Sequence, residues 1–302
     1  MKEGGGMKKK SSVLNNKSTT MWIYLFVLPT IIIFAVFYLV PIITVFATSF
    51  TKWDGFNPVK FIWFGNYIKL FTQPEFLISL KNILLWSILA ATVHVGFGVL
   101  IAFLLYQKPF GWRFVRSVFM IPNIIAVAAW AVIYRFFFNN DFGVLNNMVR
   151  IINPSFDVAW FYESPYAFWA ITFTWLFYAV IVTLIVLTDL MAIPTELHEA
   201  ASIEGASSWQ TVLKVDMPLI KNAVGVSMIL SMTSRIAMYE AIALTSRGGP
   251  GDDTMSIPLI LVNAITNMKY GYANAAAVAM ILIGIAILFI VQKSFKMNEK
   301  NS

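Results

Sequence analysis

The chain has 302 residues, of which 59% are apolar and only 12% are charged. Soluble domains carry about 25% charged residues, so this composition excludes a single soluble core. The net charge of +7 does not indicate a nucleic-acid partner, because the Lys and Arg residues lie beside apolar segments, where such residues set membrane topology. The absence of cysteine excludes a disulfide framework and a thiolate metal site.

Six apolar segments are long enough to cross a bilayer, because a helix needs about 20 apolar residues to span about 30 Å of hydrocarbon. The first is too long for the apolar region of a signal peptide, and its Pro29 and Pro41 are expected to kink or break the helix. The sequence therefore predicts an all-α polytopic membrane protein with six transmembrane helices. The predicted spans are residues 22–50, 80–105, 115–138, 165–190, 219–245 and 272–292.

Basic residues are divided unequally between the two sides of these spans. The side with more Lys and Arg holds both chain ends and the loops after the second and fourth spans. The more basic side faces the cytoplasm, so we expect both termini and the loop after the fourth span to be cytoplasmic. Arg113 and Arg116, near the start of the third span, are interpreted as topology anchors rather than substrate ligands.

The sequence predicts one membrane domain, residues 21–295, between two flexible cytoplasmic tails, residues 1–20 and 296–302. Residues 1–6 are a candidate translated leader, because Lys-Glu-Gly-Gly corresponds to a purine-rich ribosome-binding sequence ahead of Met7. A natural tail and an added cloning sequence are the alternatives.

The loop 195–218 is the most polar long stretch of the chain. Thr195 is suited to cap a helix, and Gly205 supplies the left-handed turn that ends this helix. A second short helix is expected to follow, until Pro218 ends it at the membrane. By themselves these features indicate a connector that lies on the bilayer surface.

The spacing within this loop indicates more than a connector. Glu199-Ala200-Ala201, then Gly205 after three residues and Val215-Asp216-Met217-Pro218 after nine more, resembles the EAA loop of ABC importer permeases. The family pattern is EAA-x3-G-x9-I-x-LP, so Val215 replaces Ile and Met217 replaces Leu. In that family the loop docks on the ATP-binding subunit. The resemblance implies that role for Glu199, Ala200, Ala201, Gly205 and Pro218.

Further segments resemble the carbohydrate-uptake permeases, namely those for maltose, multiple sugars or glycerol 3-phosphate. The resemblance covers about residues 22–295 and implies the type I ABC importer permease architecture, also called MetI-like, in a bacterial plasma membrane. It implies transport of a sugar, with an oligosaccharide favoured. The segments are FGNYIKLF at 64–71, GWRFVRSVFMIP at 111–122, ALTSRGGPGDDT at 243–254 and YGYANAAAVA at 270–279.

The same resemblance implies partners: a second, homologous permease, two copies of a cytoplasmic ATP-binding subunit, an extracytoplasmic solute-binding protein and membrane lipid. The chain lacks the G-x-x-x-x-G-K-[ST] phosphate loop. We therefore expect no enzyme activity, catalytic residue, metal or cofactor in this chain, with ATP and Mg bound by the partner ATPase. Transport would follow alternating access.

Two other classes remain as alternatives. An ion-coupled secondary transporter needs an intramembrane carboxylate, and Glu240 is the clear candidate, but no inverted repeat is visible. A membrane-embedded enzyme needs a catalytic constellation, and the sequence shows neither paired carboxylates nor a His-rich cluster.

Polar residues deep in a span are costly and often functional. Arg235 and Glu240 lie five residues apart in the predicted fifth span, where they either share a cavity or pair elsewhere. His94 is interpreted as a hydrogen-bonded histidine inside the bundle. Ser231 and Met232 are possible cavity neighbours. The candidate residues of the substrate path are Arg235, Tyr239, Glu240 and Asn263.

Overall fold

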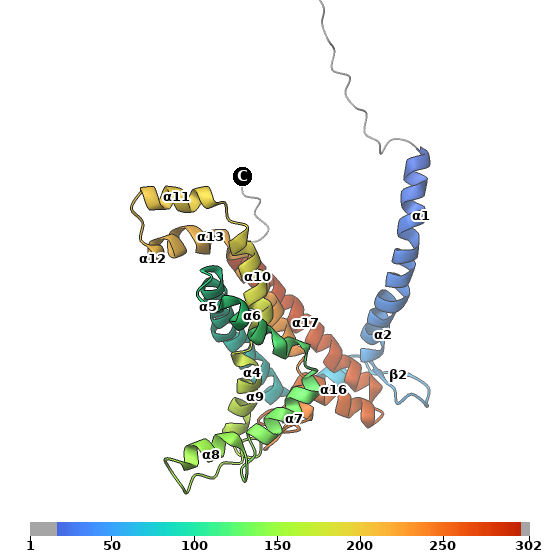
Figure 1. Ribbon diagram of the computed structural model, residues 1–302. Helices are drawn as coiled ribbons and strands as arrows, with labels where there is room; N and C mark the ends of the chain where they lie inside the picture. Colours follow the sequence, from blue (N-terminus) through green and yellow to red (C-terminus); the bar gives the residue numbers. More distant parts are fainter. Residues whose placement is uncertain (1–16, 297–302) are drawn as a thin grey trace, which may run out of the picture.

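Helices dominate residues 17–296, the part of the chain that the computed structural model describes (Figure 1). The predicted all-α polytopic architecture is confirmed. Four helices are long and apolar enough to cross a membrane, and the number rises to six when each of two bent helix pairs counts as one span. The expected start at Met7 and the outer parts of both predicted tails lie outside the described residues.

The first span is a long helix that stands beside the bundle formed by the other helices (Figure 1). It begins at Lys17 rather than at the predicted Trp22, and it continues through Pro29. Its apolar window is 0% buried, so its surface is open to lipid or to another subunit. At its far end, Asn274 Nδ2 donates to Thr48 Oγ1 at 2.6 Å. Its segments are α1 (Lys17–Phe34), the π-helical η2 (Ala35–Leu39) and α2 (Val40–Ser49).

Three further spans form the centre of the bundle. Gly98 lets the second and fourth spans approach closely, because a Cβ at this residue would lie 2.6 Å from Val182 Cγ1. Thr183 Oγ1 donates across the same contact to the carbonyl oxygen of Gly98 at 3.1 Å. The second span comprises α4 (Pro74–Leu89), η3 (Ala90–His94) and α5 (Val95–Tyr106), the fourth comprises α9 (Tyr166–Leu176) and α10 (Val180–Met191), and the sixth is α17 (Tyr270–Phe295).

The third predicted span, residues 115–138, is wrong as a single helix. Pro122 lacks the N–H group that would continue an α-helix, and the chain there is 3-10 helical before Ile125 and Ala126 become extended. The helices on the two sides of this break meet at 103°. They are α6 (Trp112–Met120) with η4 (Ile121–Ile124), followed by α7 (Val127–Phe137).

The fifth predicted span, residues 219–245, ends early. Its helix α14 covers Lys221–Ile236, and a separate short helix, α15 (Glu240–Ala243), follows. After α15 the chain forms a loop instead of a longer helix, and a side chain of the second span holds this loop by hydrogen bonds. Asn82 Nδ2 donates to the carbonyl oxygens of Asp253 and Met255, both at 3.0 Å.

Small elements lie at the end of the bundle opposite the helices α11 to α13. These elements are the antiparallel strands β1 (Thr51–Lys52) and β2 (Lys60–Phe61), and the helices α3 (Gly65–Thr72), α8 (Val144–Arg150) and α16 (Ile257–Thr266). Arg150 fixes the loop between the third and fourth spans, because it donates to the carbonyl oxygens of Asn140, Asp141 and Phe156 at 2.7, 2.9 and 2.8 Å.

The core consists of two clusters of buried apolar residues. One joins α4, α9, α16 and α17 around Trp86, Phe76 and Ile171, which are almost fully buried. The other joins α5, α10 and α14 around Val95 and Val186. Phe295 at the end of α17 packs against this second cluster. The described chain therefore returns to the end of the bundle that carries the helices α11 to α13 (Figure 1).

Candidate functional site

Residues 195–219 form a helix–turn–helix that projects from one end of the bundle, and we call it the polar hairpin (Figure 1). Gly205 has a φ of +76°, which confirms the predicted left-handed turn. The N–H of Ala206 donates to the Ala201 carbonyl at 2.9 Å and that of Gly205 to the Ser202 carbonyl at 3.0 Å, the paired bonds of a Schellman ending. The elements are α11 (Thr195–Ile203), α12 (Ser208–Thr211), the π-helical η5 (Val212–Asp216) and α13 (Met217–Leu219).

The helix ends of the polar hairpin differ in part from the prediction. Thr195 is the first helical residue, and its neighbour Pro194 holds the cap position without a side-chain bond. Ser207 caps the second helix, in a reciprocal pair of bonds with Gln210. Pro218 does not end the helix. It lies inside α13, which ends one residue later at Leu219, and the 68° bend to α14 follows there.

A polar contact to a buried aspartate joins the two arms of the hairpin. His198 on α11 bonds to Asp216 Oδ1 at 2.8 Å, and Asp216 is only 3% exposed. The His198 ring also lies 6.4 Å from the ring of Tyr106 at the end of α5. This contact fixes the angle between the arms and ties them to the bundle. The bond between His198 and Asp216 was not predicted from the sequence. The feature that could have indicated it is an acidic residue, Asp216, between the apolar Val215 and Met217.

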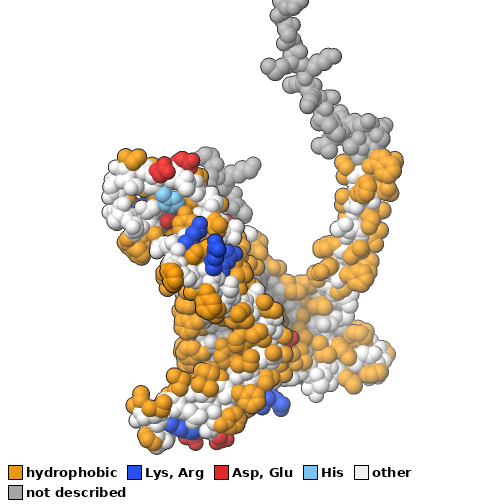
Figure 2. All heavy atoms as spheres, in the orientation of Figure 1, with side chains coloured by type: hydrophobic (Ala, Val, Ile, Leu, Met, Phe, Trp, Pro, Cys, Tyr) orange, Lys and Arg blue, Asp and Glu red, His pale blue; other side chains and the backbone are white. Residues whose placement is uncertain are grey.

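The residues predicted to contact an ATPase differ in exposure within the polar hairpin. Glu199 and Ala200 are exposed, whereas Ala201 is buried within the hairpin. Acidic side chains gather on the outer face of the hairpin (Figure 2). Ile203 and Trp209, at its turn, are 87% and 69% exposed. A projecting tip that exposes two large apolar side chains, with acidic groups beside it, is suited to fit a cleft on another protein.

A second site is a cavity of about 190 Å³ lined by residues of η3, α9, α10 and α14 and open on one side to the surface of the chain. Arg235 of α14 points its guanidinium over the ring of Trp175, 4.3 Å from the ring centroid. Its Nε and Nη2 donate to Ser234 Oγ at 3.2 and 3.0 Å. None of the described residues that line this cavity is acidic, and within the described part of the chain no acidic side chain pairs with Arg235. Asn123, at the break in the third span, also lines the cavity.

Three buried polar atoms in this cavity have no hydrogen-bond partner among the described residues: Trp175 Nε1, Tyr178 OH and Ser227 Oγ. His94 lines the cavity too, and its Nδ1 donates to the Leu176 carbonyl at 3.0 Å, as expected for a bonded histidine in the bundle. The unpaired atoms were not found from the sequence, because aromatic and hydroxyl side chains occur throughout the predicted spans.

The other predicted residues of the substrate path lie elsewhere. Glu240 is exposed at the start of α15, a separate short helix beyond the end of α14, so it does not share a helix with Arg235. Tyr239 is half-buried just before it, and Met232 packs on the first core cluster. Asn263 lines a separate cavity of about 410 Å³ with Lys69, Gln73 and Glu75. Of the predicted residues, the structure brings Arg235 and Ser231 to one cavity.

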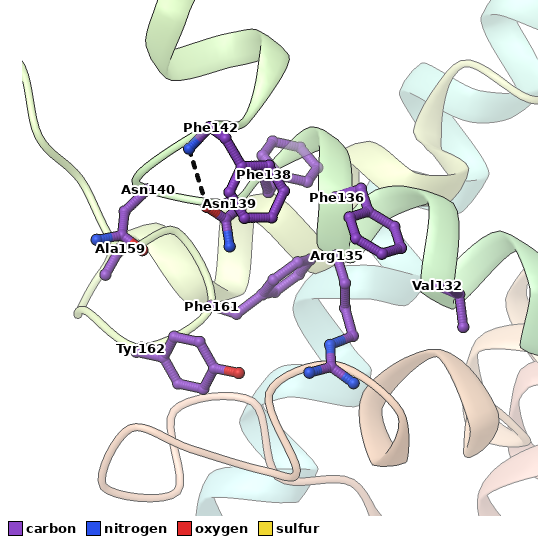
Figure 3. A pocket seen from close by; sticks show the side chains of 10 residues that line it. All are labelled: Val132, Arg135, Phe136, Phe138, Asn139, Asn140, Phe142, Ala159, Phe161 and Tyr162. Atoms are coloured by element: carbon purple, nitrogen blue, oxygen red, sulfur yellow. Dashed lines mark hydrogen bonds between the residues drawn. The ribbon is translucent and has the colours of Figure 1, made fainter.

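Two adjoining cavities lie at the end of α7, away from the polar hairpin. The first, of about 290 Å³, is lined by Arg135, Asn139 and Tyr162, and Figure 3 shows the Arg135 guanidinium and the Tyr162 hydroxyl pointing toward one another. The second, of about 280 Å³, shares Arg135 and Tyr162 and adds Ser246 and Arg247. Among residues 17–296 no cluster of His, Asp and Glu is arranged to hold a metal ion.

Comparisons with known proteins agree with this architecture. The probable ABC transporter permease protein YurN of Bacillus subtilis is 28% identical over 283 residues, covering 92% of this chain and 97% of that protein. The trehalose/maltose transport system permease protein MalF of Thermococcus litoralis is 28% identical over 276 residues, with coverages of 89% and 92%. A chain from the crystal structure of a bacterial ABC transporter involved in the import of the acidic polysaccharide alginate shares the fold, with a TM-score of 0.81 and 21% identity over 94% of this chain and 98% of that one.

The family match covers most of the chain and includes both sites. Residues 94–300 match the family described as "Binding-protein-dependent transport system inner membrane component". This stretch begins at His94 in the cavity and contains the whole polar hairpin. The chain therefore belongs to the family of inner-membrane components of binding-protein-dependent transport systems.

Proposed function

We propose that this chain is the permease subunit of an ATP-driven sugar importer in the bacterial plasma membrane. The observation that supports this most directly is the polar hairpin, a rigid helix–turn–helix with an exposed tip, in a chain of this family. Relatives named as permeases for starch degradation products, trehalose and maltose, and multiple sugars support a sugar as the substrate. An oligosaccharide is the favoured form.

The polar hairpin is the element that receives energy from outside the chain. In this proposal, two cytoplasmic ATP-binding subunits hold ATP and Mg, and one of them grips the hairpin through Glu199, Ala200 and the exposed tip. The bond between His198 and Asp216 makes the two arms move as one body. The hairpin is continuous with α10 on one side and α14 on the other, so its motion is transmitted to Arg235 in the cavity.

This motion would change the side from which the cavity is open. Closure of the ATP-binding subunits favours one of two arrangements of the bundle, and differential binding shifts the population between them. Irregular backbone within a membrane is tolerated where it lines a cavity, and the break in the third span places Asn123 at such a position. The broken spans therefore support a path through this part of the bundle.

Other subunits would complete the path. The uncovered first span offers a surface for a second, homologous permease. A solute-binding protein would deliver sugar at the end of the molecule that carries α8 and α16, with the hairpin and both termini on the cytoplasmic side.

The alternative, an ion-coupled secondary transporter, needs an intramembrane carboxylate for its coupling ion. Glu240 was the candidate from the sequence, but it is exposed and lies beyond the helix of the fifth span. This position weakens the alternative.

Co-purification with a tagged chain, followed by reconstitution, tests the proposed function. We expect a second permease and an ATP-binding subunit to co-purify. After reconstitution in vesicles, uptake of labelled sugar should require ATP on the side of the membrane that carries the polar hairpin. Uptake by this chain that needs an ion gradient and no ATP-binding subunit would contradict the proposal.

A further inference from the structure

The cavity around Arg235 holds a positive charge that no acidic side chain among residues 17–296 neutralises. The guanidinium stacks on Trp175 and donates to the hydroxyl of Ser234, but within the described residues no carboxylate pairs with it. A charge at membrane depth is costly and is normally paired or faces a functional cavity. Counting 1.5 Å per residue, Arg235 lies about 20 Å along α14 from its hairpin end, which places it well inside the membrane.

The same cavity presents hydrogen-bond donors without partners. The indole N–H of Trp175 can only donate, and it is buried and unpaired, as are Tyr178 OH and Ser227 Oγ. Buried polar groups are usually hydrogen-bonded, so three unpaired atoms around one cavity indicate that something else occupies it. One cation and several donors, with no acidic residue in the lining, fit a ligand that brings acceptor oxygens and negative charge.

We propose that this cavity binds the acidic group of an anionic saccharide, with Arg235 as its counter-ion. The inference rests on the proposed function, because it names the class of sugar that the permease carries. A carboxylate, a sulfonate or a phosphate offers the oxygens that a guanidinium binds in a bidentate manner. Trp175 holds the guanidinium from behind, while Tyr178 and Ser227 are available to the remaining oxygens.

The cavities at the end of α7 agree with this substrate class. Arg135 and Arg247 line them, none of the described lining residues is acidic, and neither arginine has an acidic partner within residues 17–296. Figure 3 shows the Arg135 guanidinium pointing toward the hydroxyl of Tyr162, and both residues line both cavities. Clefts lined by one sign of charge concentrate ligands of the opposite sign. An anionic sugar would thus meet positive charge before it reaches Arg235.

Ligand binding to the purified complex tests the proposal without any variant. The probes are trigalacturonate, its carboxyl-reduced neutral analogue, a sulfonated sugar and glycerol 3-phosphate, each added without nucleotide or binding protein. We expect at least one anionic probe to raise the thermal unfolding temperature, with the neutral analogue causing no shift. Whichever anionic probe acts identifies the acidic group. Stabilisation by the neutral analogue equal to that by trigalacturonate would overturn the proposal.

Variants then assign the effect to Arg235. Arg235→Gln should weaken binding of the active anionic probe about 100-fold, because it removes a buried charge-assisted contact. Arg235→Lys should retain part of the affinity, since it keeps the charge and loses the bidentate geometry. Arg113→Gln is the matched control, because Arg113 also lies over a tryptophan, at 5.6 Å from the Trp112 ring, but outside the cavity. It should bind the probe normally.

Two outcomes separate this inference from the proposed function. ATP-driven uptake of neutral sugars alone, unchanged in Arg235→Gln, would leave the importer standing and overturn the anionic substrate. Failure of Arg235→Gln to assemble with its partner permease, together with no binding of any anionic probe to the unmodified complex, would mean that a partner carboxylate pairs with Arg235. That result would also overturn the inference.

Discussion

At Gly205 the backbone is left-handed, with φ at +76°, and an added Cβ would meet no atom within 4 Å. A substitution there acts through backbone strain, which costs about 1–2 kcal/mol for an ordinary residue and more for a β-branched one. We expect Gly205→Val to reach the membrane at near-normal levels, because the spans satisfy their own hydrogen bonds. It should bind the ATP-binding subunit poorly and lose sugar uptake.

The chain offers a matched control for Gly205→Val. Gly111 has a φ of +79° and equally open surroundings, but it lies outside the polar hairpin. Gly111→Val should therefore carry similar strain and keep most of the uptake. Pull-down of the ATP-binding subunit beside uptake of labelled sugar measures both variants. Full transport by Gly205→Val would contradict the role given to the hairpin.

The pair His198 and Asp216 gives a second prediction at the residue scale. Asp216→Ala leaves His198 without its partner across the hairpin and should lower stability of the hairpin by about 1–3 kcal/mol. Glu199→Ala should be milder, because Glu199 is exposed and its loss removes one polar contact with a partner. A double-mutant cycle over His198→Ala and Asp216→Ala, read as affinity for the ATP-binding subunit, measures the coupling. Additive effects would show that the contact does not hold the arms together.

At the scale of elements, the contact between α5 and α10 depends on Gly98. A Cβ at Gly98 would lie 2.6 and 2.7 Å from the side chain of Val182 and 3.1 Å from Ala179 Cβ. Gly98→Ala should therefore destabilise the chain by about 1–3 kcal/mol through overpacking. Gly96 lies two residues earlier, on a different face of the same helix, where an added Cβ meets nothing within 4 Å. Gly96→Ala should therefore be neutral or slightly stabilising.

Thermal unfolding of the detergent-solubilised complex measures this pair of variants. Adding Val182→Ala to Gly98→Ala should restore part of the loss, because it removes the atoms that the new methyl group meets. An equal unfolding temperature for Gly96→Ala and Gly98→Ala would refute the close approach of the two helices.

How far the sequence predicts the structure depends on the range of the interactions at each element. The polar hairpin was predictable because its turn is local: Gly205 needs a left-handed conformation, and the bonds that follow join residues five or fewer apart. The end of the fifth span was not predictable, because the loop that follows this span is held by Asn82, which is 171 residues away from its partner in the sequence. Apolar length indicates that a segment crosses the membrane, but not where tertiary hydrogen bonds break its helix.

The cavity shows the same limit. Arg235 was identified because a charged residue is rare in a span. Trp175 and Tyr178 resemble the many other aromatic residues of the chain until the fold places them around that arginine. Asn263 and Glu240 were selected for their polarity, and the fold directs them to other surfaces.

At the scale of the whole molecule, the first span is the least buried of the four long spans within the described residues. Its apolar window is 0% buried, and its α2 end is fixed to the bundle through Thr48 and Asn274. Lipid can cover such a helix, but a cavity with Arg235 on one side also needs a wall on the other. We therefore expect a different, homologous permease to complete the pathway, forming a pseudo-twofold heterodimer above two ATP-binding subunits.

The heterodimer predicts that this chain is inactive alone. Expressed without its partner permease, it should insert into the membrane, because each span satisfies its own backbone hydrogen bonds, but it should show no ATP-dependent uptake. Single cysteines introduced at Val36 or Ile43, both exposed on the first span, and labelled with a thiol-reactive photo-cross-linker should cross-link to the partner permease in the complete complex; because this chain has no native cysteine, the label is confined to the introduced position. Cross-linking of two copies of this chain, together with sugar uptake by that homodimer, would contradict this arrangement.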